Sequence, residues 1–170
     1  KKLVIFGQNI AAASCLSGLT RGLTKNSVPQ SVVQQEGENF IINTPNCENT
    51  LVGTGFGLML NGVSSIFCMK QQDFLLLGID QLVNTYNLIR GRTTPSSFTI
   101  LSIIVDSGFE GPQSCLNNFA DFCSLARIPG YAITNWHDAS KIIDTKLVSP
   151  GFRIIGLSQR LFKTETSQLD

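Results

Sequence analysis

The alternation of short apolar runs with helical segments constrains the fold of this chain more than any other feature. Six runs have the length and β-branched or aromatic content of buried strands: 3–7, 39–43, 63–68, 98–105, 131–134 and 152–157. Helical patterns lie between them, at 13–23, from 47–48 onward, and at 72–89, 116–126 and 138–147. Strands that alternate with helices predict a mostly parallel sheet covered on both faces, a three-layer α/β/α fold. The length fits a single domain over residues 1–170.

The uncharged stretch 49–69 has the length of a membrane-spanning helix. It also contains Asn61-Gly62, a turn-forming pair, and several other glycines and serines. We therefore predict a helix followed by a strand, and no contact with a membrane.

The composition narrows the classes of partner. Charged residues make up only 15% of the chain, below the usual quarter, which predicts that part of the surface is buried against another chain. A net charge of +1 gives no electrostatic basis for binding nucleic acid. Five cysteines without a Cys-x-x-Cys pair, and one histidine, argue against a disulfide framework and a metal site. We expect buried thiols in a reducing, cytoplasmic setting.

Three segments follow predicted strands and should meet at one edge of the sheet, namely 44–48, 69–74 and 106–114. Glu48 lies there among apolar and small residues. Its desolvation would favour a protonated or proton-sharing form, which suits proton exchange with a ring nitrogen. An equally simple reading is a carboxylate that only stabilises the start of a helix.

Other reactive residues give weaker signals. His137, beside Trp136, precedes a predicted helix and fits a capping or solvent-edge role better than catalysis. Cys47 and Cys115 lie in predicted loops without a neighbouring base, so inert thiols are the simpler interpretation. Three alternating glycines (53, 55 and 57) predict close approach to another backbone or to a bound ring, rather than a dinucleotide fingerprint.

Several motifs occur in the order found in one enzyme family. They are Asn43-Thr44-Pro45-Asn46-Cys47-Glu48, Gly53-x-Gly55-x-Gly57, Asp73-Phe74-Leu75 and Ile79-Asp80-Gln81-Leu82-Val83-Asn84, with Gly111-Pro112-Gln113 and Ile128-Pro129-Gly130 further on. This order resembles the pyrimidine-binding domain of the transketolase family of thiamine diphosphate enzymes. It is most similar to the β subunits of 2-oxo acid dehydrogenase E1 components.

The resemblance implies roles for individual residues. Glu48 matches the glutamate that hydrogen-bonds N1′ of the aminopyrimidine and promotes its imino form. Phe74 matches the aromatic residue that packs on the pyrimidine ring. Asn46 and Lys70 fall at other positions that line the pocket, and an uncharged residue is usual at the position of Lys70.

The sequence also departs from the family pattern. A histidine usually follows the Gly-Pro-Gln segment in the substrate channel, but here Ser114 and Cys115 follow Gln113. These three residues and His137 are the candidates for the channel. The helix that usually precedes the first strand and the C-terminal domain of complete E1 β chains are not in the sequence.

The resemblance implies thiamine diphosphate as cofactor, with Mg²⁺ held mainly by a separate diphosphate-binding subunit. This chain would then form a self-dimer within an α2β2 heterotetramer acting on a small carbonyl or sugar-phosphate substrate. Because the C-terminal domain is missing, we favour transketolase-like ketol transfer. The alternatives are an E1 β-type component of a 2-oxo acid dehydrogenase or decarboxylase, and a non-catalytic interaction module of the same fold.

Overall fold

The computed structural model describes residues 3–10, 40–107 and 116–162. In these ranges the chain forms a six-stranded sheet with the order β2-β1-β3-β4-β6-β5, and every neighbouring pair is parallel. The strands are β1 (Leu3–Gly7), β2 (Phe40–Asn43), β3 (Ser64–Met69), β4 (Ser97–Ile104), β5 (Gly130–Ile133) and β6 (Gly151–Ser158). All six predicted strands are confirmed within one or two residues, and the fold is the predicted three-layer α/β/α arrangement. The predicted helix at 13–23 lies outside the described residues.

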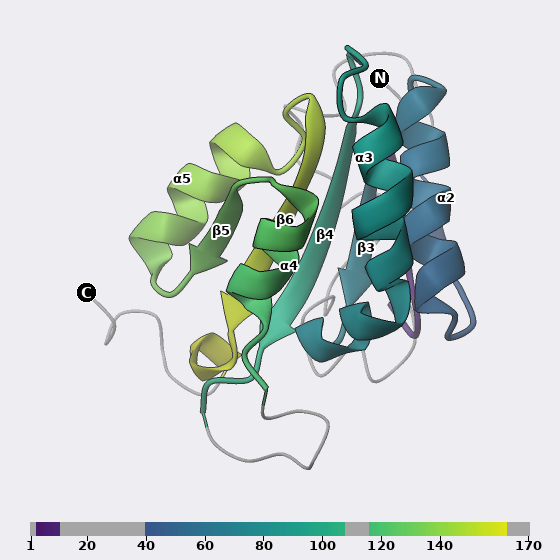
Figure 1. The fold of residues 1–170 in the computed structure, drawn as a ribbon. Helices are drawn as coiled ribbons and strands as arrows, with labels where there is room; N and C mark the ends of the chain where they lie inside the picture. The colour runs from purple at the N-terminus through teal and green to yellow at the C-terminus, as the bar shows by residue number, and fades with distance from the viewer. Residues whose placement is uncertain (1–2, 11–39, 108–115, 163–170) are drawn as a thin grey trace.

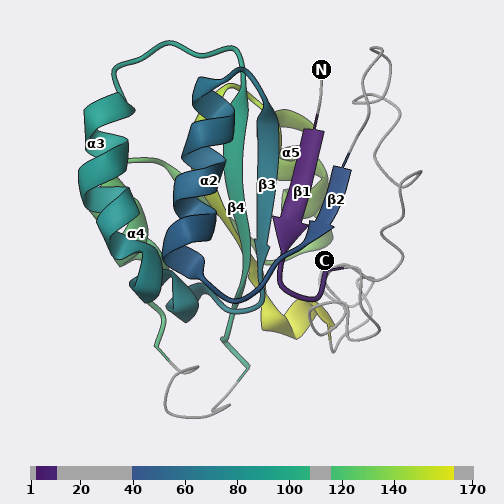
Figure 2. The ribbon, with the colours of Figure 1, turned by 90° about the vertical axis from the view of Figure 1, so that its right-hand side faces the viewer.

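Helices cover both faces of this sheet. They are α2 (Glu48–Leu60), the helical segment 72–89 that ends in α3 (Tyr86–Ile89), α4 (Phe119–Ala126) and α5 (Trp136–Lys146), and a 3₁₀ turn, Gln159–Phe162, follows β6. Figure 1 shows the sheet between α2 and α3 on one side and α5 on the other. Figure 2 shows α2, α3 and α4 together on a single face.

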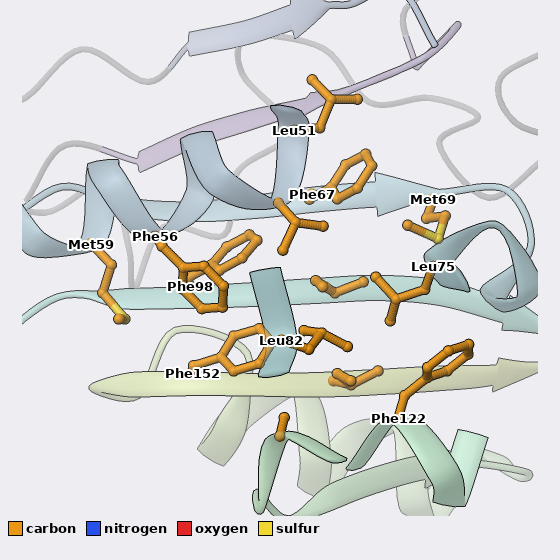
Figure 3. Packing of buried hydrophobic residues seen from close by; sticks show 14 of the residues in the cluster. Leu51, Phe56, Met59, Phe67, Met69, Leu75, Leu82, Phe98, Phe122 and Phe152 are labelled. Carbon is orange, nitrogen blue, oxygen red and sulfur yellow. The ribbon is translucent and has the colours of Figure 1, made fainter. Parts of the chain in front are cut away.

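The larger core lies between the sheet and this three-helix face, and it is rich in phenylalanine. The ring of Phe98 stacks on Phe152 at 5.2 Å between centroids and meets Phe56 of α2 edge-on at 5.1 Å. Figure 3 shows these rings between α2 and the strands, with Leu75 and Leu82 beside them. A smaller core on the opposite face joins β1 and β3 to the residues that follow α5.

The segment 72–89 is helical throughout, as predicted, but it is not a regular α-helix. It runs as a 3₁₀ helix over Gln72–Gly78, makes a π-helical turn over Gln81–Thr85, and is α-helical only at α3. Leu75 and Leu82 are buried in the core. Leu77 and Leu88 are 64% and 83% exposed, so part of the apolar surface of this segment is left open in the single chain.

The uncharged stretch 49–69 divides as predicted, into α2 and then β3. Among the described residues, no helix is both long enough and apolar enough to cross a membrane.

Candidate functional site

A hollow of about 270 Å³ lies at the carboxyl end of the sheet, where β1 and β3 end and α2 begins. Its described lining combines four polar residues with an apolar floor: Gln8, Asn46, Glu48, Leu51, Phe67, Cys68, Met69, Lys70 and Phe74. The hollow is open to solvent, and its volume includes part of that open space.

Glu48 is the first residue of α2, and its side chain is only 9% exposed. Cys47 precedes it at the N-cap position without a side-chain cap, and its sulfur instead lies 3.0 Å from the Thr50 hydroxyl. In the described part of the chain, the Glu48 carboxylate has neither a hydrogen bond nor an ion pair. Its oxygens are not among the fully enclosed polar atoms that lack a partner, so solvent in the hollow reaches them. A ligand that offers a hydrogen-bond donor or a cation there would replace that solvent.

Phe74 reaches the same hollow from the other side, in the 3₁₀ turn that follows β3. Gly78, one turn later, allows this turn to approach α2. A Cβ on Gly78 would lie 3.1 Å from Val52 Cγ2 and 3.4 Å from the Glu48 carbonyl oxygen. The Phe74 ring packs partly on the large core and is half-buried, so the rest of it remains available to the hollow.

Asn46 and Lys70 are the exposed members of the lining. Lys70 directly follows Met69, the last residue of β3, so the sheet fixes the position of its backbone. Its ammonium group has no ion-pair partner among the described residues, and it is not paired with Glu48. The structure therefore brings together all four predicted cofactor-binding residues, although none of their roles is tested by this geometry alone.

Gln8 lines the hollow, and the sequence analysis missed it. It follows Gly7, at which a Cβ would lie 2.3 Å from the Cys68 carbonyl oxygen, so only glycine lets the end of β1 come this close to β3. The available signal was the apolar run ended by glycine and followed by an amide. Its significance depends on β1 and β3 being neighbours in the sheet.

Of the predicted substrate-channel residues, only His137 is described, and it does not line this hollow. Gln113, Ser114 and Cys115 lie outside the described residues. His137 is exposed in the first turn of α5, which starts at Trp136 rather than at the predicted Asp138. Strand β5, which leads into this helix, is three positions from β3 in the sheet, or about 14 Å at the usual strand spacing.

The third predicted segment also lies apart from the hollow where it is described. Asp106 follows β4 and accepts a hydrogen bond of 2.6 Å from Ser158 Oγ, while its backbone oxygen accepts from the guanidinium of Arg160. These contacts tie the ends of β4 and β6 to each other. The first two segments therefore meet at the hollow, and residues 108–114 of the third segment lie outside the described residues.

A buried polar cluster supports the turn that carries Phe74. Asp73 accepts a hydrogen bond of 3.4 Å from Asn118 Nδ2, and Gln72 donates to Leu116 O and Asn117 Oδ1. Burial raises the pKa of Asp73, an effect that the Asn118 hydrogen bond partly offsets. One oxygen of Asp73 and the amide oxygen of Gln72 are buried without a partner. This cluster connects the 3₁₀ turn to the start of α4.

The cysteines differ in accessibility. Cys68 and Cys123 are buried free thiols, as predicted, and burial raises the pKa of Cys123 to about 11. The prediction of a buried thiol is wrong for Cys47, because the N-cap of α2 lies at the surface.

The glycines of α2 have an explanation in packing. A Cβ on Gly55 would meet the Phe98 ring, so this close approach is to the protein core and not to a ligand.

The structure is that of a parallel α/β protein with a small hollow at the carboxyl edge of its sheet. Two chloroplastic proteins of Arabidopsis thaliana, subunits beta-3 and beta-2 of the pyruvate dehydrogenase E1 component, are each 29% identical to this chain over 86 residues. The similarity covers 51% of this chain but only 21% of each relative, so the chain spans about a fifth of the curated relatives it matches. No protein-family model matches the chain.

These relatives agree with the resemblance at a coarse level. They are β subunits of an E1 component, the group to which the sequence motifs are most similar, and they come from an enzyme complex. They are not transketolases, so the preference for ketol transfer gains no support from them.

Proposed function

We propose that this chain is the pyrimidine-binding part of a thiamine diphosphate enzyme, in which the hollow at Glu48 and Phe74 holds the aminopyrimidine ring. The observation that carries the proposal is the buried, unpartnered carboxylate of Glu48 opposite a half-buried aromatic ring. The described lining fits a single planar ring with one polar edge. When bound, thiamine diphosphate would supply a thiazolium carbon that adds to a substrate carbonyl and stabilises the carbanion that follows.

The residues of this chain would act on the ring rather than on the substrate. Glu48 would share a proton with the N1′ ring nitrogen, a contact strengthened by the low polarity around it. Phe74 would pack on one face of the ring, and Leu51 would supply apolar surface on the floor of the hollow. A proton shared at N1′ would acidify the exocyclic amino group, which could then lose a proton to give the imino form. The imino nitrogen would be the base, and promoting this form is the contribution that the half-site would make to catalysis.

The reaction class follows from the relatives. Their similarity favours a 2-oxo acid as the substrate, as in an E1 β-type component, over the ketol transfer preferred from the sequence. Both reactions use the same half-site, so the distinction depends on the substrate channel, whose predicted residues include Gln113, Ser114 and Cys115.

We further propose that the diphosphate group and Mg²⁺ are held by a separate subunit. Within the described residues, no cluster of histidine, cysteine, aspartate or glutamate could hold a metal ion. The exposed Leu77 and Leu88 provide apolar surface that a partner or a second copy could cover.

The test is reconstitution with a diphosphate-binding subunit, thiamine diphosphate and Mg²⁺. Turnover would be measured with pyruvate and an electron acceptor, and in parallel with a ketose phosphate donor and an aldose phosphate acceptor. We expect activity with the 2-oxo acid and at least a hundredfold lower kcat for Glu48→Gln, because general acid–base contributions are about 10²- to 10⁴-fold.

Asp121→Asn is the matched control, since Asp121 is an exposed carboxylate in the first turn of α4, away from the hollow. It should keep full activity. Equal activity of Glu48→Gln and wild type would refute the proposed role of Glu48, and turnover of the ketose phosphate alone would assign ketol transfer instead.

A further inference from the structure

We infer that Lys70 recognises an anionic group, a phosphate or a carboxylate, on the ligand or substrate that occupies the hollow. This inference rests on the proposed function, because it concerns what lies next to the pyrimidine. It adds the residue of this chain that would hold the negative group of such a ligand, which neither the fold nor the relatives identify.

The first argument is the charge distribution of the lining. Lys70 is the only cationic residue among the described residues around the hollow, and Glu48 is the only anionic one. The rest are apolar side chains and the amides Gln8 and Asn46. An aminopyrimidine is neutral and needs no cation, so ring binding does not account for a lysine at this position.

The second argument is that Lys70 does not neutralise Glu48. The two side chains line one hollow, yet they form no ion pair, and neither has another ionic partner among the described residues. Glu48 is buried at the base and Lys70 is exposed. A ligand can therefore meet both, with a ring nitrogen at the carboxylate and a negative group at the ammonium.

The third argument is position. Lys70 is fixed at the end of β3, and the carboxyl edge of a parallel sheet is where ligands bind. The start of α2 lies at the same edge without a side-chain cap, and its partial positive charge adds to that of Lys70. A solvated lysine elsewhere on the surface would have no such neighbours.

The test compares two probes by NMR titration of the ¹⁵N-labelled full chain. The neutral probe is 4-amino-5-hydroxymethyl-2-methylpyrimidine, and the anionic probe is its phosphate monoester. We expect the ester to bind about three- to tenfold tighter, as one partly exposed charge pair allows. This gain should shrink as the salt concentration rises from about 0.05 M to about 0.5 M.

The variants identify the source of the gain. Lys70→Met should remove it without changing the affinity for the neutral probe, and Lys70→Arg should restore it. Lys141→Met, which removes an exposed charge from α5, should behave as wild type. An ester that binds no tighter than the alcohol, or a gain that persists in Lys70→Met, would overturn the inference.

Two further titrations test whether the anionic group is a carboxylate and whether the pyrimidine site itself exists. Pyruvate added to the chain saturated with the neutral probe tests the carboxylate source, and Lys70-dependent shifts would assign it. Failure of the neutral probe to shift the amides around Glu48 and Phe74 would refute the pyrimidine site instead. Inorganic phosphate and pyruvate alone would then still test Lys70, with no Lys70-dependent shift as the negative result.

Discussion

Gly55 and Gly57 of α2 provide a matched test of how this helix packs on the sheet. Both are helical glycines two residues apart. Through helix propensity alone, replacing either with alanine should raise the free energy of unfolding by about 1 kcal/mol. Their surroundings differ. A Cβ on Gly55 would lie 2.2 Å from two atoms of the Phe98 ring, whereas a Cβ on Gly57 would have nothing within 4 Å.

The Phe98 ring has little room to yield. It is fully buried and is held by Phe56 and Phe152 in close ring contacts. Ordinary contact requires more than 3 Å, so α2 or the ring would have to move by about 1 Å, and overpacking of this kind costs about 1–3 kcal/mol or more. We expect Gly55→Ala to be destabilised by about 1–2 kcal/mol net, and Gly57→Ala to be stabilised by about 1 kcal/mol.

Thermal and urea unfolding, followed by circular dichroism, would measure the difference. For a chain of this size each kcal/mol shifts Tm by about 2–4 °C, so the two variants should differ by about 4–12 °C. Equal midpoints for Gly55→Ala and Gly57→Ala would refute the packing described here. Urea m-values should stay unchanged, since neither substitution alters the surface exposed on unfolding.

Three other predictions concern the buried charges and the exposed leucines. The raised pKa of Asp73 means that the folded state holds its proton at pH values where the unfolded chain has lost it. Stability should therefore fall as pH rises above the ordinary aspartate pKa of 3.8 and then level off at the folded-state pKa. Asp73→Asn should be more stable than wild type at pH 7 and should lack this decrease in stability with pH. Urea midpoints that change with pH in the same way in both proteins would contradict this prediction. Arg153 is 4% exposed, donates to Thr99 Oγ1, Pro150 O and Gly151 O, and has a pKa lowered by burial to about 10. Arg153→Met should cost about 1–3 kcal/mol, because it removes these hydrogen bonds from a buried side chain. A urea midpoint within error of wild type would exclude this role. Leu88→Asp should leave the unfolding midpoint of the single chain unchanged and weaken assembly with a second copy or partner, as followed by analytical ultracentrifugation, whereas an unchanged association would show that this leucine is not at an interface.

The sequence predicts the sheet well because its signals are local. Each strand is a short apolar run bounded by turn residues, and each helix begins near a polar or acidic residue. The parallel arrangement follows from the alternation alone. Glu48 and Phe74 could be placed at one edge for the same reason, since each follows the carboxyl end of a strand.

The features that the sequence did not predict depend on tertiary contacts, which leave no periodic pattern in the sequence. The 3₁₀ and π geometry of 72–89 accompanies the close approach of Gly78 to the first turn of α2, which links residues 30 positions apart. Gln8 belongs to the hollow only because β1 lies beside β3 rather than in chain order. His137 is separated from it for the same reason, because β4 and β6 lie between β3 and β5.

The central claim is that the Glu48 carboxylate shares a proton with a ring nitrogen of an aminopyrimidine bound beside Phe74. The most direct measurement is the ¹⁵N chemical shift of N1′ in ¹⁵N-labelled 4-amino-5-hydroxymethyl-2-methylpyrimidine, free and bound to the full chain. We predict a large upfield shift on binding to wild type and to Asp121→Asn, as protonation or a strong hydrogen bond produces. The shift should be lost with Glu48→Gln. An unchanged N1′ signal in the wild-type complex, or the same upfield shift with Glu48→Gln, would contradict the account.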